Sequence, residues 1–311
     1  MRHTFHLVPA DELAVFVRGA AGRAERDVRW VRGKGVPDRA IEGMIDAALE
    51  AMSEPRTRRE IAERVSRSLG VRQRTALGGG WGNQARIPAV AVGGMTLPIV
   101  YLFHLLGARG VICSGPPRGQ EPTYVRADAW LPRWRDVPRD VAEQRLLRRY
   151  LQTFGPATPA DFAYWVGLPL RDARAIWIRE DTRLAPVSID GALATVLSED
   201  VQRLTTARPV RPPLRLLPSF DAHLLGYRDR RHLIAPERLK TVYRTHGWVE
   251  AVILAGGCVV GTWTLARERD RLRVVVAPFA ALSRSTIGAI REEAHDLRRF
   301  LGAARVDVRI R

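Results

Sequence analysis

The sequence predicts a mainly α-helical protein with β wings, in which tandem winged helices precede a carboxy-terminal β-rich (α+β) domain. Twice, three helical patterns are followed by a β-hairpin pattern, which is the element order of a winged helix. A proline-rich segment, ARPVRPPLR, comes next, and strand patterns predominate beyond it. The predicted boundaries are a remnant strand and helix at 1–37, winged helices at 38–130 and 138–198, and the β-rich domain at 212–311.

The chain opens with RHTFHLVPADELAVF, in which Phe5, Leu7 and Val8 predict a buried strand. Pro9 and the acidic residues after it predict that a helix, DELAVFVRGAA, begins there. The next segment, RWVRGKGVP, is expected to be flexible and basic. These elements form the predicted remnant at the amino-terminal end.

The first three-helix unit begins with PDRAIEGMIDAALEAMS, which repeats apolar residues at helical spacing. In TRREIAERVSRSLG, Thr57 and Glu60 have the spacing of a capping box, and Gly70 ends the helix. A glycine-rich insertion, ALGGGWGNQARIPAVAVGG, precedes a third helix, TLPIVYLFHLLGARG. The strands VICSG and TYVRADAWL, joined by PPRGQEP, then predict a hairpin.

The second unit repeats this order without repeating the residues. Its helices are DVAEQRLLRRYLQTFG, TPADFAYWVG and LPLRDARAIWIRE, the second of which starts with Thr158 as N-cap and Pro159 at the first helical position. The segment RLAPVSIDGALATVL predicts a hairpin that turns at Asp190 and Gly191.

The carboxy-terminal part carries four strand patterns, LRLLPSFD, WVEAVILAG, CVVGTWTLAR and RLRVVVAPF, with a tight turn at Gly256 and Gly257. A helix, STIGAIREEAHDLRRFLG, and a last strand, RVDVRI, complete it. The pattern predicts a small α+β or barrel-like domain.

The net charge of +17 indicates a polyanionic partner, and nucleic acid is the first choice. A coding bias toward arginine is the alternative explanation, because Lys34 and Lys240 are the only lysines. Cys113 and Cys258 lie in apolar stretches and are expected to be buried thiols in a reducing cytoplasm. Without a secretion signal or a run of 18 apolar residues, we expect a cytoplasmic, nucleoid-associated protein that does not enter membranes.

Strong catalytic signatures are missing from the sequence, which contains no Walker loop, no Gly-x-Ser-x-Gly, no His-Glu-x-x-His and no Cys-x-x-Cys. The seven histidines lack metal-ligand spacing, and His104 is expected to be a core residue. We therefore predict no metal and no small-molecule cofactor, and no catalytic residue can be assigned.

The densest polar cluster is FDAHLLGYRDRRHLI, at 220–234. In this cluster Arg228, Arg230 and Arg231 are candidates for phosphate contacts, and Tyr227 is a candidate for stacking on a base. The alternative is a solvated loop in which arginine and aspartate pair with one another.

Three further arginines are candidate DNA ligands. Arg118 lies in the first predicted wing, where a neighbouring glycine lets the backbone approach a minor groove or a phosphate, although an ordinary hairpin tip would look the same. Arg171 and Arg174 lie in the third helix of the second unit, and we predict that both bind DNA.

Several long segments resemble one bacterial family. RHTFHLVPADEL, GVICSGPPRGQEPTYVRADAWLP, LRRYLQTFGPATPADFAYWVGLPL and the stretch from LLPSFDAHLLGYRDRRHLI to AGGCVVGTW are similar to the winged-helix DNA-binding-domain family, which includes the crosslink-unhooking DNA glycosylases of the azinomycin-resistance type. The resemblance covers nearly the whole chain. It implies tandem winged helices around a DNA channel and, for characterised members, hydrolysis of the N-glycosidic bond of bulky or crosslinked N7-alkylguanine.

The chain departs from that family at its catalytic motif. In the family, the Arg-x-Thr-x-His-Leu-Val-Pro segment follows a first winged helix that carries Gln-x-Gln or Gln-x-Asp, whereas in this chain it begins at residue 2. None of the six glutamines is followed two residues later by Gln or Asp. Either the start codon has been assigned too late, which an unpaired opening strand favours, or the chain is a shortened paralogue without glycosylase activity.

His6 is the one polar side chain of the opening strand that could line such a site, as an auxiliary lesion contact or as a buried hydrogen bonder. The sequence thus predicts a protein that binds double-stranded DNA, alkylated or crosslinked DNA included, of DNA-repair glycosylase ancestry. Restoring the missing catalytic unit would make it a glycosylase acting on alkylated guanine. The alternative is a sequence-specific DNA-binding regulator without enzymatic activity.

Overall fold

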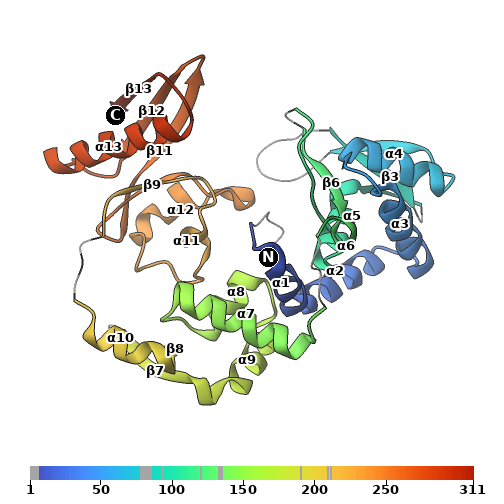
Figure 1. Cartoon of the computed structure of the whole chain (residues 1–311), viewed down its shortest axis with the longest axis horizontal. Helices are drawn as coiled ribbons and strands as arrows, with labels where there is room; N and C mark the ends of the chain where they lie inside the picture. Colours follow the sequence, from blue (N-terminus) through green and yellow to red (C-terminus); the bar gives the residue numbers. More distant parts are fainter. Residues whose placement is uncertain are drawn as a thin grey trace. The chain divides into compact units, whose positions relative to one another are not determined.

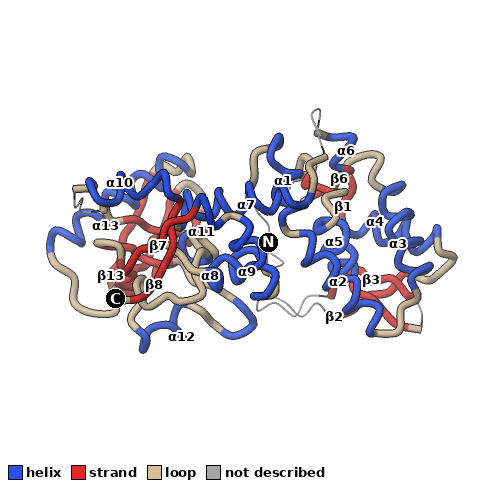
Figure 2. The backbone as a smooth tube through the Cα atoms, turned by 90° about the horizontal axis from the view of Figure 1, so that it is seen from below, coloured by secondary structure: helices blue, strands red, loops and turns tan. Residues whose placement is uncertain are grey.

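The computed structural model describes residues 7–77, 86–92, 94–119, 121–131, 136–189, 191–208, 210 and 212–311. The chain separates into two compact units, residues 1–199 and 200–311. Each unit contains both helices and strands, so the protein is mixed helix and sheet (Figure 1; Figure 2). In the described residues, no helix has both the length and the apolar composition needed to cross a membrane.

The first unit, residues 1–199, is built mainly from helices. These are α1 (Leu13–Gly19), α2 (Ala21–Gly33), α3 (Asp38–Ala51), α4 (Arg58–Ser68), α5 (Ile99–Ala108), α6 (Ala127–Trp130), α7 (Arg139–Phe154), α8 (Pro159–Val166) and α9 (Leu170–Arg179). Its strands are β1 (Arg56–Thr57), β2 (Gln73–Leu77), β3 (Arg86–Val92), β4 (Met95–Pro98), β5 (Ile112–Ser114), β6 (Thr123–Arg126), β7 (Leu184–Ile189) and β8 (Ala192–Leu197). They form three sheets, with the orders β1-β6-β5, β2-β3-β4 and β7-β8.

The opening segment joins the first unit through α1, which packs against α7. A Cβ atom on Gly19 would lie 2.8 Å from Leu146 Cδ2, so the glycine allows the two helices to approach closely. Arg18 Nε donates a hydrogen bond of 2.7 Å to Asp136 and supports the same contact. The predicted strand falls mostly outside the described residues, and Leu7, which is described, is fully exposed and belongs to no strand.

The expectation of a flexible basic stretch after α1 is wrong, because α2 continues to Gly33. Val31 and Val36 are each 2% exposed and anchor this segment in the first core. Burial of Val31 stabilises α2, and burial of Val36 holds the segment that follows it. The glycines and charged residues around them made this helix hard to predict from the sequence.

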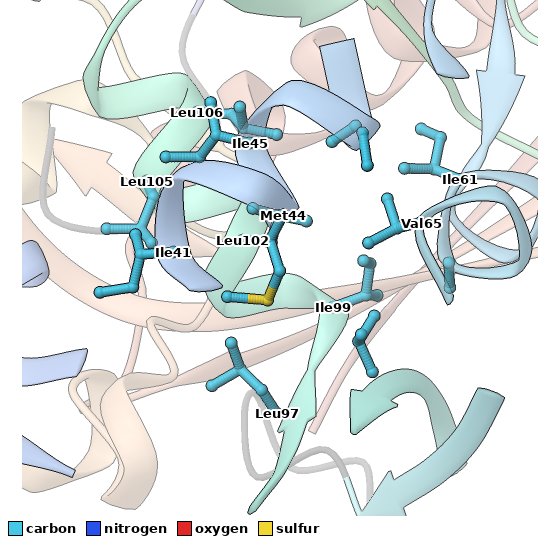
Figure 3. Packing of buried hydrophobic residues seen from close by; sticks show 14 of the residues in the cluster. Ile41, Met44, Ile45, Ile61, Val65, Leu97, Ile99, Leu102, Leu105 and Leu106 are labelled. Carbon is cyan, nitrogen blue, oxygen red and sulfur yellow. The ribbon is translucent and has the colours of Figure 1, made fainter. Parts of the chain in front are cut away.

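The first core lies between α3, α4 and α5 (Figure 3). It contains the side chains Ile41, Met44, Ile45, Ile61, Val65, Leu97, Ile99, Leu102, Leu105 and Leu106. Removing each such side chain from water contributes about 1.5–3 kcal/mol. The predicted capping box at the start of α4 is present, because Thr57 accepts from the Glu60 amide and the Glu60 carboxylate accepts from the Thr57 amide.

A three-stranded antiparallel sheet that was not predicted from the sequence surrounds the glycine-rich insertion: β3 lies within the insertion, and β2 and β4 lie at its two ends. The third helix, expected from Thr96, therefore begins only at Ile99. In this sheet β3 pairs with β2 on one side and with β4 on the other. Ala89 and Val90 in β3 are buried, which explains why this part of the segment is ordered as a strand. Residues 78–85 and 93 lie outside the described residues.

The order of three helices and a hairpin recurs in α7, α8, α9 and the β7-β8 hairpin. Thr158 is the N-cap of α8 and Pro159 occupies the first turn, as the sequence predicts; Thr158 also forms a capping box with Asp161. The helices pack around Tyr150 and Phe162, both 0% exposed, with ring centroids 5.4 Å apart. The predicted hairpin is present, with Gly191 at φ 81°, while Asp190 lies outside the described residues.

The second unit, residues 200–311, is built on a five-stranded sheet with the order β13-β12-β11-β10-β9. Its strands are β9 (Arg215–Leu217), β10 (Val252–Ala255), β11 (Cys258–Glu268), β12 (Arg271–Pro278) and β13 (Arg305–Ile310), and its helices are α10 (Val201–Thr206), α11 (Ala222–Leu225), α12 (Leu239–Val242) and α13 (Arg284–Phe300). All five predicted strands and the predicted helix are present. Gly256 and Gly257 both have positive φ, as the tight turn between β10 and β11 requires.

Two cores lie on opposite faces of this sheet. Val252 belongs to the core beneath α11 and α12, while the next residue, Ile253, belongs to the core beneath α13. Consecutive strand residues point to opposite faces, so each face of β10 is covered. The expectation that both cysteines are buried is wrong, because Cys258 is exposed at the start of β11 and Cys113 is half-buried. His104 is half-buried beside the Tyr101 ring.

Candidate nucleic-acid interface

The third helices of the two repeated units differ sharply in their surfaces. In the first three-helix repeat (α3, α4 and α5), α5 carries no charged residue along its ten positions, IVYLFHLLGA. It also contacts α2, and the Trp30 ring stacks on the Tyr101 ring with centroids 4.9 Å apart. A helix that is almost entirely apolar, with the Trp30 ring packed on its Tyr101 side chain, is suited to packing against other elements. It offers no cationic donors to a DNA groove.

In contrast, α9 divides into a buried and an exposed face. Ala173, Ile176 and Trp177 face the core and are 8% exposed or less. The opposite face presents Arg171 and Arg174, one helical turn apart, together with the exposed Ala175 and Ile178. This face combines long cationic side chains with an apolar surface, which are the groups that read base edges and thymine methyls.

The two arginines of α9 are available for a ligand. Arg171 has an exposed side chain and a hydrogen bond of 3.2 Å to its neighbour Asp172. Arg174 is exposed and has no ion pair or side-chain hydrogen bond within the described part of the chain. An exposed pair such as Arg171 and Asp172 is worth about 0–1 kcal/mol, so a phosphate or guanine can displace the carboxylate at small cost.

Arg118 lies in the turn between β5 and β6, as the sequence predicts, but its guanidinium folds back onto α4. It donates a hydrogen bond of 2.8 Å to Glu60 Oε1 and one of 3.1 Å to the Pro55 carbonyl. The backbone hydrogen bond from Thr57, followed by the one from Arg118, lowers the pKa of Glu60 to about 2. Arg118 therefore serves as an ion-pair partner of the capping box in this conformation.

The polar cluster at 220–234 is held by contacts within itself and with the rest of the second unit. Arg231 donates several hydrogen bonds to Asp229, which lower the pKa of this carboxyl to about 2. The guanidinium of Arg230 lies 3.8 Å from the centre of the Tyr243 ring. Tyr227 packs partly against the core beneath α11, with its ring 4.5 Å from that of His232. This arrangement matches the pairing alternative for Arg231, while Arg228 is exposed to solvent.

The candidate residues therefore fall into separate groups. Residues 1–199 hold Arg118, in the turn between β5 and β6, and Arg171 and Arg174, both on α9. Residues 200–311 hold the others, which share one segment: Tyr227, Arg228, Arg230 and Arg231. His6 lies outside the described residues. In the ranges that the structure describes, no group of three or more metal-ligating side chains is assembled.

The exposed arginines of α2, Arg26 and Arg29, were not predicted from the sequence, because the expected helix ends at Ala21 and the stretch from Arg29 was expected to be flexible. A pattern of Val28 and Val31 at helical spacing is the signal that could have revealed this helix.

Comparison with known families places the chain among the DNA glycosylases. The family model described as DNA glycosylase AlkZ-like matches residues 1–300, and the chain belongs to this AlkZ-like family. The family resemblance found in the sequence is thereby confirmed.

A sequence match and a structural match agree with this assignment. An interstrand DNA cross-link repair glycosylase from Streptomyces sahachiroi is 29% identical over 324 residues, which cover 100% of this chain and 80% of the relative. The solved structure of the DNA glycosylase AlkZ from the same organism has a TM-score of 0.75 and 27% identity, and the match covers 98% of this chain and 78% of that one.

Proposed function

We propose that this protein binds double-stranded DNA through tandem winged helices, the first formed by α3, α4, α5 and the β5-β6 hairpin and the second by α7, α8, α9 and the β7-β8 hairpin. The observation that carries the proposal is the exposed face of α9. A major groove about 12 Å wide admits one α-helix, and arginine forms bidentate hydrogen bonds with guanine O6 and N7. Arg171 and Arg174 supply such donors from a helix that is otherwise anchored by Ile176 and Trp177.

Within this arrangement α5 has a supporting role. It has no charged side chain with which to contact DNA, and α2 packs against it. The first winged helix would then contact the phosphate backbone through other elements, such as the turn that carries Arg118 or the basic surface of α2.

The substrate class that we propose is duplex DNA containing alkylated or crosslinked guanine. The family is described as DNA glycosylase AlkZ-like, and the Streptomyces sahachiroi relative is named for interstrand cross-link repair. Alkylation at N7 makes guanine cationic and therefore a good leaving base, so hydrolysis mainly needs a positioned water and a group that holds it.

We further propose that the 311-residue chain recognises such DNA but does not release the base. The resemblance assigns the positioning of water to Gln-x-Gln or Gln-x-Asp, and none of the glutamines of this chain stands in either motif. The proposed activity is thus recognition without base release.

A sequence-specific regulator is the second candidate, because Arg171 and Arg174 on α9 could read base identity in undamaged DNA. Competition binding separates the two functions. A labelled duplex is displaced by unlabelled duplexes of the same sequence with and without N7-methylguanine, and by a duplex of shuffled sequence.

We expect the methylated competitor to displace the label at a lower concentration than the plain duplex, and the shuffled competitor to match the plain duplex. Lesion recognition selects the base that unstacks most easily, whereas a regulator selects sequence. If only the shuffled competitor differs from the others, the regulator is the correct assignment.

A further inference from the structure

The sheet of the second unit has one face that α13 covers and another that is covered only in part. Val274 and Val276 of β12 point to α13 and pack with Ile290 and Ala294. Because side chains alternate along a strand, Arg271, Arg273 and Val275 point to the other face. The parallel register between β12 and β13 places Arg305, Asp307 and Arg309 beside these three residues on that same face.

The core beneath α11 and α12 covers this other face only near β9, β10 and the beginning of β11. Its buried strand residues are Val252 and Val259, and the partly buried Phe279 directly follows β12. Farther along, Thr264 and Ala266 in β11 are exposed, as are Arg305 and Arg309 in β13. One half of the sheet face, over the end of β11 and over β12 and β13, is therefore open; we call it the open sheet face.

The open sheet face is positively charged. It carries four arginines and two carboxylates, namely Arg271, Arg273, Arg305, Arg309, Glu268 and Asp307. Arg271 pairs with Asp307 at 2.6 Å, and Arg273 pairs with Glu268 at 2.9 Å. The guanidinium groups of Arg305 and Arg309 have no hydrogen-bond or ion-pair partner among the residues that the structure describes. Two cations thus remain uncompensated at the edge strand.

We propose that the open sheet face binds the phosphate backbone of duplex DNA, with Arg305 and Arg309 as its phosphate ligands. This inference rests on the proposed DNA binding and adds a contact in the second unit. Four residues of a strand span about 13 Å, so the two guanidinium groups reach separate phosphates along one strand of the duplex.

The composition of the face favours duplex DNA over a single strand. Proteins that bind single strands stack bases on aromatic side chains. The uncharged residues of the open sheet face are Thr264, Ala266 and Val275, none of which is aromatic. Charged residues also protect an edge strand from pairing with another chain. That role does not require two cations without a carboxylate partner. The excess of arginines over carboxylates on the open sheet face indicates a polyanionic ligand.

The test uses the full chain with Arg305→Gln and Arg309→Gln together. The matched control is Arg284→Gln with Arg291→Gln, which removes two exposed arginines from α13, the helix on the covered face. Duplex affinity is measured over a series of salt concentrations, and melting temperatures verify that each variant is folded. We expect the first pair to weaken duplex binding about tenfold and to reduce the salt slope by about 1.8, and the control to change neither.

The outcomes distinguish this inference from the proposed function. If the wild-type chain does not bind duplex DNA, both fail. If the wild-type chain binds and the two variants lose equally little or equally much affinity, the proposed function stands and the open sheet face is not a DNA contact. If the loss is as large on a single-stranded oligonucleotide as on the duplex, the assignment to duplex DNA is overturned.

Discussion

Replacing Arg171 and Arg174 together by glutamine is expected to weaken duplex binding by at least about 30-fold. Each bidentate arginine contact with a guanine is worth about 1–3 kcal/mol, so the two contribute about 2 kcal/mol or more. Both side chains are exposed on α9, and their loss leaves the buried face of Ala173, Ile176 and Trp177 intact. The melting temperature should therefore stay close to that of the wild type.

The matched control for this prediction is Arg64→Gln with Arg67→Gln. These arginines are exposed on α4 with the same spacing of three residues. We expect a smaller loss of affinity that is uniform across DNA sequences, as for contacts with phosphate alone. Fluorescence anisotropy with two duplexes of different sequence measures both effects. Equal losses for the two pairs on both duplexes would show that α9 does not enter a groove.

The affinity for duplex DNA is expected to fall by about 1,000-fold when the salt concentration rises from about 50 to about 200 mM. A chain with a net charge of +17 that contacts at least about six phosphates releases the counterions condensed on them. A titration in which sucrose replaces the added salt serves as control and should leave the affinity unchanged. An affinity that is insensitive to salt would remove the electrostatic basis of the proposed function.

Much of the fold could be predicted because its signals are local. Thr57 with Glu60, and Thr158 with Pro159, mark helix starts through hydrogen bonds made within one turn. The strands of the second unit follow from their β-branched residues and from the paired glycines between β10 and β11.

The elements that were missed depend on distant contacts. The helix α2 looks like a basic loop because its stability comes from valines that pack against another part of the chain. Likewise, β3 lies in a glycine-rich segment and owes its order to the burial of Ala89 and Val90. Neither contact can be read from the neighbouring residues in the sequence.

The sequence predicts which residue types form the candidate site, but not how their side chains are arranged or paired. The sequence identified Arg118 and Arg231 as exposed cations, yet each is held by a carboxylate, Glu60 and Asp229 respectively. The absence of charge from α5 and the arginines of α9 are visible in the sequence, but the contact between α2 and α5 became known only from the structure. The open sheet face was missed because alternation of polar and apolar residues does not reveal which half of a sheet is covered.

The proposal tested here is that this chain recognises alkylated duplex DNA without releasing the base. The most direct measurement incubates the purified 311-residue chain with a duplex containing N7-methylguanine, or a bulkier adduct, and follows both complex formation and the appearance of free base. The account predicts a stable complex, and free base at the rate of the uncatalysed control. Release of base well above that control would contradict it and would mean that a residue with an assigned structural role positions the attacking water.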